Sequence, residues 1–98
     1  MAKVKWSEIA DIDLIQIYSY IYQDSVYYSI KTINDILNLV VNLKFSQYMG
    51  RKVPEYNLRE IRELIYKSYW IIYEVKIGKI LILRIWHSAR NLPKQLIS

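Results

Sequence analysis

The apolar residues of this 98-residue chain change their spacing once, near residue 47, and this change constrains the fold more than any other feature. Before that point they recur every three or four positions, as on one side of a helix. After it they follow the spacing and the β-branched and aromatic composition of strands. The chain has only 2 Gly and 2 Pro, which is little turn chemistry for an all-β sandwich. The pattern predicts an α+β fold in one domain over residues 1–98, since this length has room for a single core.

Two helical stripes precede the change of spacing. The first stripe comprises Trp6, Ala10, Leu14, Ile17 and Ile21, and the second comprises Val26, Ile30, Ile33, Leu37 and Val40. Ser7 occupies an N-cap position ahead of the first stripe, while Asp24 and Ser25 offer a stop followed by a new N-cap. Because the connection is short, the two helices are predicted to form an antiparallel hairpin.

Both helices carry more apolar residues than one stripe requires. The additional positions are Ile12, Ile15, Tyr18, Tyr22, Ile36 and Leu43. One interpretation is burial on two sides, against the sheet and against the partner helix. The other is an apolar strip that is left for another protein chain to cover. The sequence does not favour either interpretation.

Four segments have the composition of strands. They span residues 2–6, 61–66, 69–76 and 80–87. A loop with Gly50, Pro54 and Asn57 is predicted over residues 47–57, and Gly78 marks a tight turn between the last two strands. The order β-α-α-β-β-β predicts a two-layer domain in which the N-terminal helical hairpin packs on one face of an antiparallel sheet.

Side-chain alternation divides the strand over residues 69–76 into two faces. The expected core set is Tyr69, Ile71, Tyr73 and Val75, and the more polar set on an open face is Trp70, Ile72, Glu74 and Lys76. Arg84, in the last strand, needs an outlet at an edge or on the open face. Trp70 is therefore predicted to be partly accessible, near Arg62, Arg84 or Arg90, and its replacement by arginine is expected to be tolerated.

Composition excludes several classes of chemistry. Cysteine is absent, so disulfides, thiol catalysis and thiolate metal sites are excluded. With a single histidine, a zinc site would need carboxylates as its other ligands. No Gly-rich phosphate loop and no metal-ligand spacing occurs, so neither a cofactor nor a metal is predicted. No stretch approaches the roughly 18 apolar residues that span a bilayer, and a cytoplasmic protein is expected.

The net charge of +5 predicts an anionic partner, whether nucleic acid, an acidic protein or an anionic membrane surface. The binding candidates are Arg51, Arg59, Arg62, Trp70 and Arg84. Guanidinium groups suit phosphate or carboxylate oxygens, and a tryptophan ring can stack on a base. The arginines would form one patch if the strands over residues 61–66 and 80–87 lie near each other. Solvated side chains that pair with neighbouring glutamates are the simpler interpretation.

His87 ends the last predicted strand and is the one histidine of the chain. An imidazole can act as a general acid or base near neutral pH. A hydrogen-bonded residue at a strand end is the simpler interpretation, because no local spacing here guarantees the geometry of a catalytic constellation.

The order and spacing of these segments resemble the RelE/ParE toxins of type II toxin–antitoxin systems, nearly from end to end. The matching segments are Trp6…Ala10…Asp13-Leu14…Ile17…Tyr20-Ile21, Gly50-Arg51…Val53-Pro54-Glu55, Arg62-Glu63-Leu64, Tyr69-Trp70-Ile71-Ile72-Tyr73 and Ile82-Leu83-Arg84-Ile85-Trp86-His87-Ser88-Ala89-Arg90. The resemblance implies the fold predicted above and a growth-inhibiting toxin that a cognate antitoxin neutralises in a hetero-oligomer. RelE-type members cleave mRNA in the ribosomal A site, whereas ParE-type members poison DNA gyrase. The implied target is therefore gyrase or the ribosome with its mRNA.

Departures from the RelE pattern favour the ParE branch. Trp70 stands where RelE-type toxins carry an arginine important for cleavage, and Ile61 and Glu63 stand where they place lysines. Loss of one such charge-stabilising contact typically costs about 3 kcal/mol of transition-state stabilisation. The resemblance thus favours ParE-like inhibition of DNA gyrase.

A nuclease alternative remains. His87, Arg90 and Glu55 are its candidate catalytic residues, with Glu60 as a second choice for the acidic partner. A third alternative is an attenuated toxin that still binds its antitoxin. For every alternative the resemblance implies an antitoxin, and the charge of the chain together with Ile12, Ile15 and Ile36 favours an acidic, amphipathic antitoxin segment.

Overall fold

The computed structural model describes residues 1–88 of the chain. Two helices and five strands follow one another in the order β-α-α-β-β-β-β, with a short 3-10 helix, η1, after the second helix. The elements are β1 (Lys3–Trp6), α1 (Glu8–Tyr22), α2 (Val26–Val41), η1 (Asn42–Lys44), β2 (Arg51–Lys52), β3 (Ile61–Tyr66), β4 (Tyr69–Lys76) and β5 (Lys79–His87). The predicted helices and strands are confirmed, and β2 is a short additional strand within the segment predicted as a loop.

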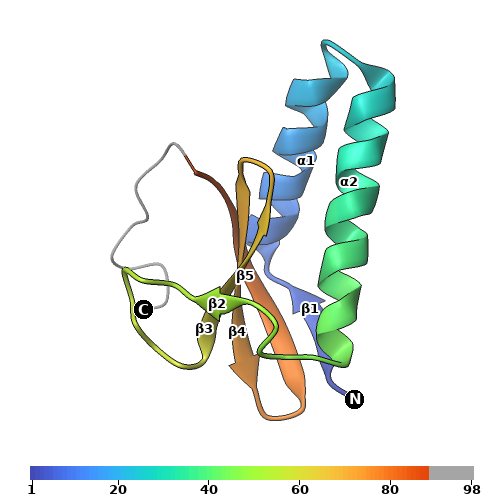
Figure 1. Cartoon of the computed structure of the whole chain (residues 1–98). Coiled ribbons are helices and arrows are strands. Elements are labelled where there is room, and N and C mark those ends of the chain that lie inside the picture. The colour runs from blue at the N-terminus through green and yellow to red at the C-terminus, as the bar shows by residue number, and fades with distance from the viewer. Residues whose placement is uncertain (89–98) are drawn as a thin grey trace.

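Serine caps begin both helices, as the sequence predicts. Ser7 Oγ accepts a 3.0 Å hydrogen bond from the amide of Ala10, and Ser25 Oγ accepts one of 3.1 Å from the amide of Tyr28. Each cap satisfies an amide that has no partner within its helix. The short link between α1 and α2 folds them back on each other as an antiparallel hairpin (Figure 1).

The sheet has the strand order β1-β5-β4-β3-β2. Four strands form an antiparallel run from β2 to β5, while β1 pairs with β5 in parallel, from Lys3 opposite Lys79 to Trp6 opposite Ile82. The sheet is therefore mixed, whereas the sequence predicted an antiparallel one. The difference arises because the first and last strands pair across more than 70 residues, a choice that no local pattern encodes.

The main core lies between the helical hairpin and the sheet (Figure 1). Its buried side chains are Ala2, Ala10, Ile17, Ile36, Val40, Leu43, Leu64, Ile71, Tyr73, Val75, Ile80, Ile82 and Ile85. The predicted core face of β4 is confirmed, since Ile71, Tyr73 and Val75 are buried there and Tyr69 packs against them. This two-layer packing is the α+β architecture that the sequence predicts.

The opposite face of the sheet is not open, and this corrects the sequence-based expectation. Val53, Ile61 and Ile72 form a second buried cluster on that face. Tyr56, Trp70, Leu83 and Trp86 pack against this cluster and are partly buried. The loop between β2 and β3 supplies Val53 and Tyr56, so a segment without regular structure covers part of the sheet. Trp70 is partly accessible as predicted, but it has packing to lose.

A buried tyrosine holds the segment that leads into β2. The hydroxyl of Tyr73 accepts a 2.9 Å hydrogen bond from the amide of Gly50 and donates one of 2.8 Å to the carbonyl of Gln47. A Cβ atom on Gly50 would lie 2.5 Å from the carbonyl oxygen of Glu63 and 2.8 Å from the Tyr73 hydroxyl. Only glycine allows this close approach, which sets the position of Arg51 next to it.

Tyr66 anchors α2 to β3 through a carboxylate. Its hydroxyl donates a 2.7 Å hydrogen bond to Asp35 Oδ2, which also accepts one of 3.1 Å from Lys31 Nζ. The hydrogen bond from Tyr66, followed by that from Lys31, holds the pKa of Asp35 below its ordinary value. A carboxyl group whose pKa is lowered by folding stabilises the fold above its unfolded pKa, and this contribution is lost as the pH falls through its folded pKa.

The stability of the chain is therefore expected to decrease as the pH falls below about 4, the ordinary pKa of an aspartate. Tyr66→Phe is expected to show a shallower decrease, because the hydrogen bond that lowers the pKa of Asp35 most is removed. Urea titrations at a series of acidic pH values measure the slope. Tyr20→Phe, at a tyrosine that is 71% exposed, is the matched control. Equal slopes for Tyr66→Phe and the wild type would contradict the prediction.

Candidate functional site

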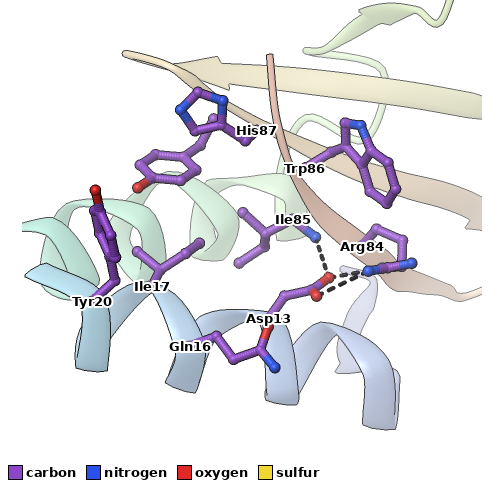
Figure 2. A pocket seen from close by; sticks show the side chains of 9 residues that line it. Asp13, Gln16, Ile17, Tyr20, Arg84, Ile85, Trp86 and His87 are labelled. Carbon is purple, nitrogen blue, oxygen red and sulfur yellow. Dashed lines mark hydrogen bonds and ion pairs between the residues drawn. The ribbon is translucent and has the colours of Figure 1, made fainter. Parts of the chain in front are cut away.

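Within residues 1–88, no strand pairs with β5 beyond the point where β1 stops. Ser7, which follows β1, donates hydrogen bonds from its amide to the carbonyl of Ile82 and from its hydroxyl to that of Leu83. β1 pairs with β5 only as far as Ile82, while β5 continues to His87. Helix α1 passes beside this part of β5, and the two elements enclose a cleft of about 480 Å³, which we call the β5 cleft (Figure 2). Its lining residues are Asp13, Gln16, Ile17, Tyr20, Tyr69, Arg84, Ile85, Trp86 and His87.

Asp13 closes one end of the β5 cleft. Its carboxylate accepts hydrogen bonds of 2.8 Å from Arg84 Nε and 3.0 Å from Arg84 Nη2 (Figure 2). It also accepts a 3.0 Å hydrogen bond from the amide of Ile85, a donor on β5 beyond the end of β1. Asp13 raises the pKa of Arg84 through this pairing. One side chain of α1 thus replaces the missing strand partner and neutralises the arginine.

A bulge in β5 decides where Arg84 points. Ile72 pairs with Arg84, whereas Tyr73 pairs with Ile82, so Leu83 is an extra residue in β5. Strict alternation from Ile82 would send Arg84 into the main core. The bulge instead turns Arg84 to the opposite face, where its guanidinium lies 4.8 Å from the centre of the Trp86 ring. Of the two predicted outlets for Arg84, an edge or an open face, the structure shows the edge, where Asp13 pairs with it.

His87 lies at the other end of the β5 cleft. Its ring is exposed and stands edge-to-face on Tyr69, with 5.5 Å between ring centres. Burial raises the pKa of the Tyr69 hydroxyl. His87 and its cross-strand partner Tyr69 belong to the face that the helices cover, and Tyr20 of α1 lines the same cleft (Figure 2).

A second group of polar residues, which we call the arginine cluster, lies around β2 and the start of β3. It consists of Tyr48, Arg51, Arg59, Arg62 and Glu63. The guanidinium groups of Arg59 and Arg62 lie 4.7 and 4.9 Å from the centre of the Tyr48 ring. Arg62 also donates hydrogen bonds to the carbonyls of Arg59 and Gly50. The Tyr48 ring thus contacts both guanidinium groups.

Glu63 is the buried member of the arginine cluster. Its side chain is 1% exposed, and Oε1 accepts a 2.6 Å hydrogen bond from Nε of Arg51, whose side chain is 57% exposed. Oε2 is buried and has no hydrogen-bond partner in the described part of the chain. The prediction that glutamates pair with these arginines therefore holds for Arg51.

The structure does not join the predicted site residues into one patch. Strand β4 lies between β3 and β5, so Arg62 and Arg84 come from strands that do not pair. Glu55 and Glu60 are exposed in the loop before β3. That loop packs on the face opposite the helices through Val53 and Tyr56, whereas His87 belongs to the helix-covered face. Arg90 lies outside the described residues. Within residues 1–88 there is no group of three or more histidine or acidic side chains that could hold a metal ion.

Asp13 is a residue of the β5 cleft that the sequence reasoning passed over. It lies three residues after Ala10 and four before Ile17, on the buried side of α1. A carboxylate within an apolar helical stripe needs a buried partner, because an unpaired charge there would be costly. That signal was present in the sequence, but it does not identify Arg84 as the partner.

The hairpin leaves part of its apolar surface uncovered. Ile12 and Ile15 are 52% and 63% exposed, on the side of α1 away from Ala10 and Ile17. The exposed residues of α2 on one helical stripe are Val26, Ile30, Leu37 and Val41. We call these six residues the hairpin face. Ile36 and Leu43 are fully buried, so the interpretation of burial holds for them, whereas Ile12 and Ile15 remain exposed.

The fold and this site define a two-layer α+β domain with an exposed apolar hairpin and a basic sheet. Residues 4–92 match the sequence model of the ParE toxin of the type II toxin–antitoxin system, parDE. The chain therefore belongs to the ParE toxin family.

A solved structure supports the assignment. The chain is similar to a structure of the chromosomal ParDE toxin–antitoxin system from P. aeruginosa, with a TM-score of 0.73 and 28% identity over 89% of this chain and 96% of the other. A comparison with curated proteins finds no match. In the described part of the chain, no helix is long and apolar enough to cross a membrane.

Proposed function

We propose that this ParE-family toxin inhibits growth by binding DNA gyrase and that a cognate antitoxin neutralises it. Membership of the ParE family over residues 4–92 carries the proposal. The gyrase target follows from the resemblance to the ParE branch, and the antitoxin follows from the toxin–antitoxin system to which the family belongs.

The packing of three positions also supports the gyrase target over a nuclease. RelE-type toxins would carry basic residues at the positions of Trp70, Ile61 and Glu63. Here Ile61 is 2% exposed in the second cluster, Trp70 packs against that cluster, and Glu63 is buried beside Arg51. None of the three offers a cationic group to an RNA phosphate, which an RNA cleavage transition state requires.

Induction of the toxin in growing bacteria tests the target. We expect an SOS response and DNA breaks before any loss of intact mRNA. Purified toxin is expected to inhibit DNA supercoiling by gyrase in a reaction without ribosomes. Cleaved mRNA before any DNA damage, with normal supercoiling, would refute the gyrase proposal in favour of the nuclease. Tolerated expression with neither effect would support the attenuated toxin.

His87→Ala separates the two mechanisms within one protein. A nuclease that uses His87 as its acid or base would lose about 10²–10⁴-fold in rate. Under the gyrase proposal the variant is expected to remain folded and toxic, because the exposed ring contributes an edge contact with Tyr69. Gln16→Ala, at another residue lining the β5 cleft, is the matched control. A folded, non-toxic His87→Ala protein beside a toxic control would contradict the prediction.

The hairpin face is the proposed binding surface for the antitoxin. Its six aliphatic side chains repeat at helical spacing, which suits the apolar side of an amphipathic segment. The toxin has a net charge of +5, which favours an acidic segment. Because the chain belongs to a toxin–antitoxin family, the binding partner proposed here is the product of the gene adjacent to the toxin gene.

Ile15→Asp and Leu37→Asp are expected to weaken antitoxin binding by about 30-fold or more, the usual effect at the centre of an interface. Both side chains are exposed, so the fold and the toxicity are expected to persist. Ile77→Asp, at a fully exposed residue of the turn between β4 and β5, is the matched control. Calorimetric titration of the purified antitoxin measures each affinity. Equal affinities for all three variants would place the antitoxin elsewhere.

A further inference from the structure

Four lysines gather on one end of the sheet, outside both groups of the candidate site. Lys79 of β5 lies directly opposite Lys76 of β4 on one side and Lys3 of β1 on the other. Lys5 lies two residues further along β1 on the same face. We call Lys3, Lys5, Lys76 and Lys79 the lysine row. In Figure 1 the start of β1 and the turn between β4 and β5 lie together at the end of the molecule opposite the turn of the helical hairpin.

The lysine row belongs to the sheet face that the helices do not cover. The neighbouring residues Val4, Val75 and Ile80 point the other way and pack in the main core. All four lysines are exposed. Strand geometry separates the three opposed residues by about 4.8 Å from one strand to the next. The ammonium groups thus share one short stretch of surface.

This arrangement works against the stability of the sheet. Like charges directly opposite each other on neighbouring strands are destabilising, and Lys79 has such a neighbour on each side. Within residues 1–88, the only ion pair of the row is that of Lys76 with Glu74, at 3.8 Å. The backbone of Glu60 lies next to β4, since its carbonyl accepts a hydrogen bond from the amide of Val75. The row therefore keeps an excess of positive charge.

We propose that the lysine row binds the phosphodiester backbone of a nucleic acid. Lysine is depleted in the cores of protein interfaces, so four lysines on one surface favour a polyanion. Exposed lysines are mobile point charges that neutralise phosphates without reading sequence. The proposal does not depend on gyrase inhibition, since it concerns other residues and a different ligand.

Fluorescence anisotropy with a labelled 20-base-pair DNA duplex and the full-length toxin tests the proposal at several salt concentrations. We expect a dissociation constant on the order of micromolar at low salt, with a slope of log K against log[salt] of about −3. Lys79→Gln is expected to reduce the magnitude of this slope by about 1, and Lys3→Gln combined with Lys79→Gln by about 2. Both lysine variants are expected to unfold at the same temperature as the wild type or at a higher one, because the repulsion between like charges decreases.

Lys67→Gln is the matched control, because it removes the same charge from the turn at the opposite end of β4. Titrations with single-stranded DNA and RNA of equal length show which nucleic acid binds with the highest affinity. Stronger binding to any of them, with the same dependence on Lys79, supports the proposal. Absence of binding at low salt, or an equal loss in Lys67→Gln and Lys79→Gln, would overturn it. Tighter binding of a poly-glutamate peptide than of every nucleic acid would assign the row to an acidic protein instead.

Discussion

Asp13→Ala is expected to lower the free energy of unfolding by about 3–5 kcal/mol, the usual effect of removing one partner of a buried ion pair. The substitution leaves the guanidinium of Arg84 without its two hydrogen bonds and the amide of Ile85 without its acceptor. The side chains of Asp13 and Arg84 are 10% and 23% exposed, so water compensates only in part. Since domains of this size are stable by about 5–15 kcal/mol in total, the variant is expected to be marginally folded.

Urea denaturation measures this loss, and Asp11→Ala supplies the control. Asp11 is an exposed aspartate in the first turn of the same helix, so its loss is expected to cost less than about 1 kcal/mol. If Asp13→Ala is too unstable to titrate, Asp13→Leu combined with Arg84→Met replaces the pair by apolar groups. This double variant is expected to recover most of the stability. A cost for Asp13→Ala no greater than that for Asp11→Ala would show that the pair does not hold α1 to β5.

Trp70→Arg is expected to destabilise the fold by roughly 2–3 kcal/mol. A fully buried tryptophan costs about 3–5 kcal/mol on truncation, and Trp70 is only partly buried. The substitution removes its packing against Val53, Ile61 and Ile72. It also places a cation directly opposite Trp86 of β5, whose ring already contacts the guanidinium of Arg84.

Ile65→Arg provides a matched control for Trp70→Arg. Ile65 lies directly opposite Trp70 on β3 and is 51% exposed, so the same new side chain is expected to cost less than about 1 kcal/mol. Thermal and urea unfolding of both variants give the comparison. Equal stabilities would restore the sequence-based expectation of an open face at Trp70.

Local patterns in the sequence were enough to predict the helices and strands, and which side of each packs in the core. The helical spacing of Ala10, Leu14 and Ile17, and the serine caps before both helices, depend on residues three or four positions apart. The alternation along β4 separates Ile71, Tyr73 and Val75 from Trp70 by the same short-range logic. These predictions are confirmed because each depends on neighbours that the chain itself brings together.

Only the tertiary structure decided how the edges of the sheet are used. The parallel pairing of β1 with β5, the bulge at Leu83 and the meeting of Asp13 with Arg84 all join residues far apart in the chain. The cover over Trp70 likewise comes from Val53 and Tyr56 in a loop. The sequence by itself determined the fold class, the helices, the strands and the charge of the molecule. The register between distant strands depends on the packing energy of the whole core. That register, and not any local pattern, decides which charged side chains meet and which lysines lie opposite one another.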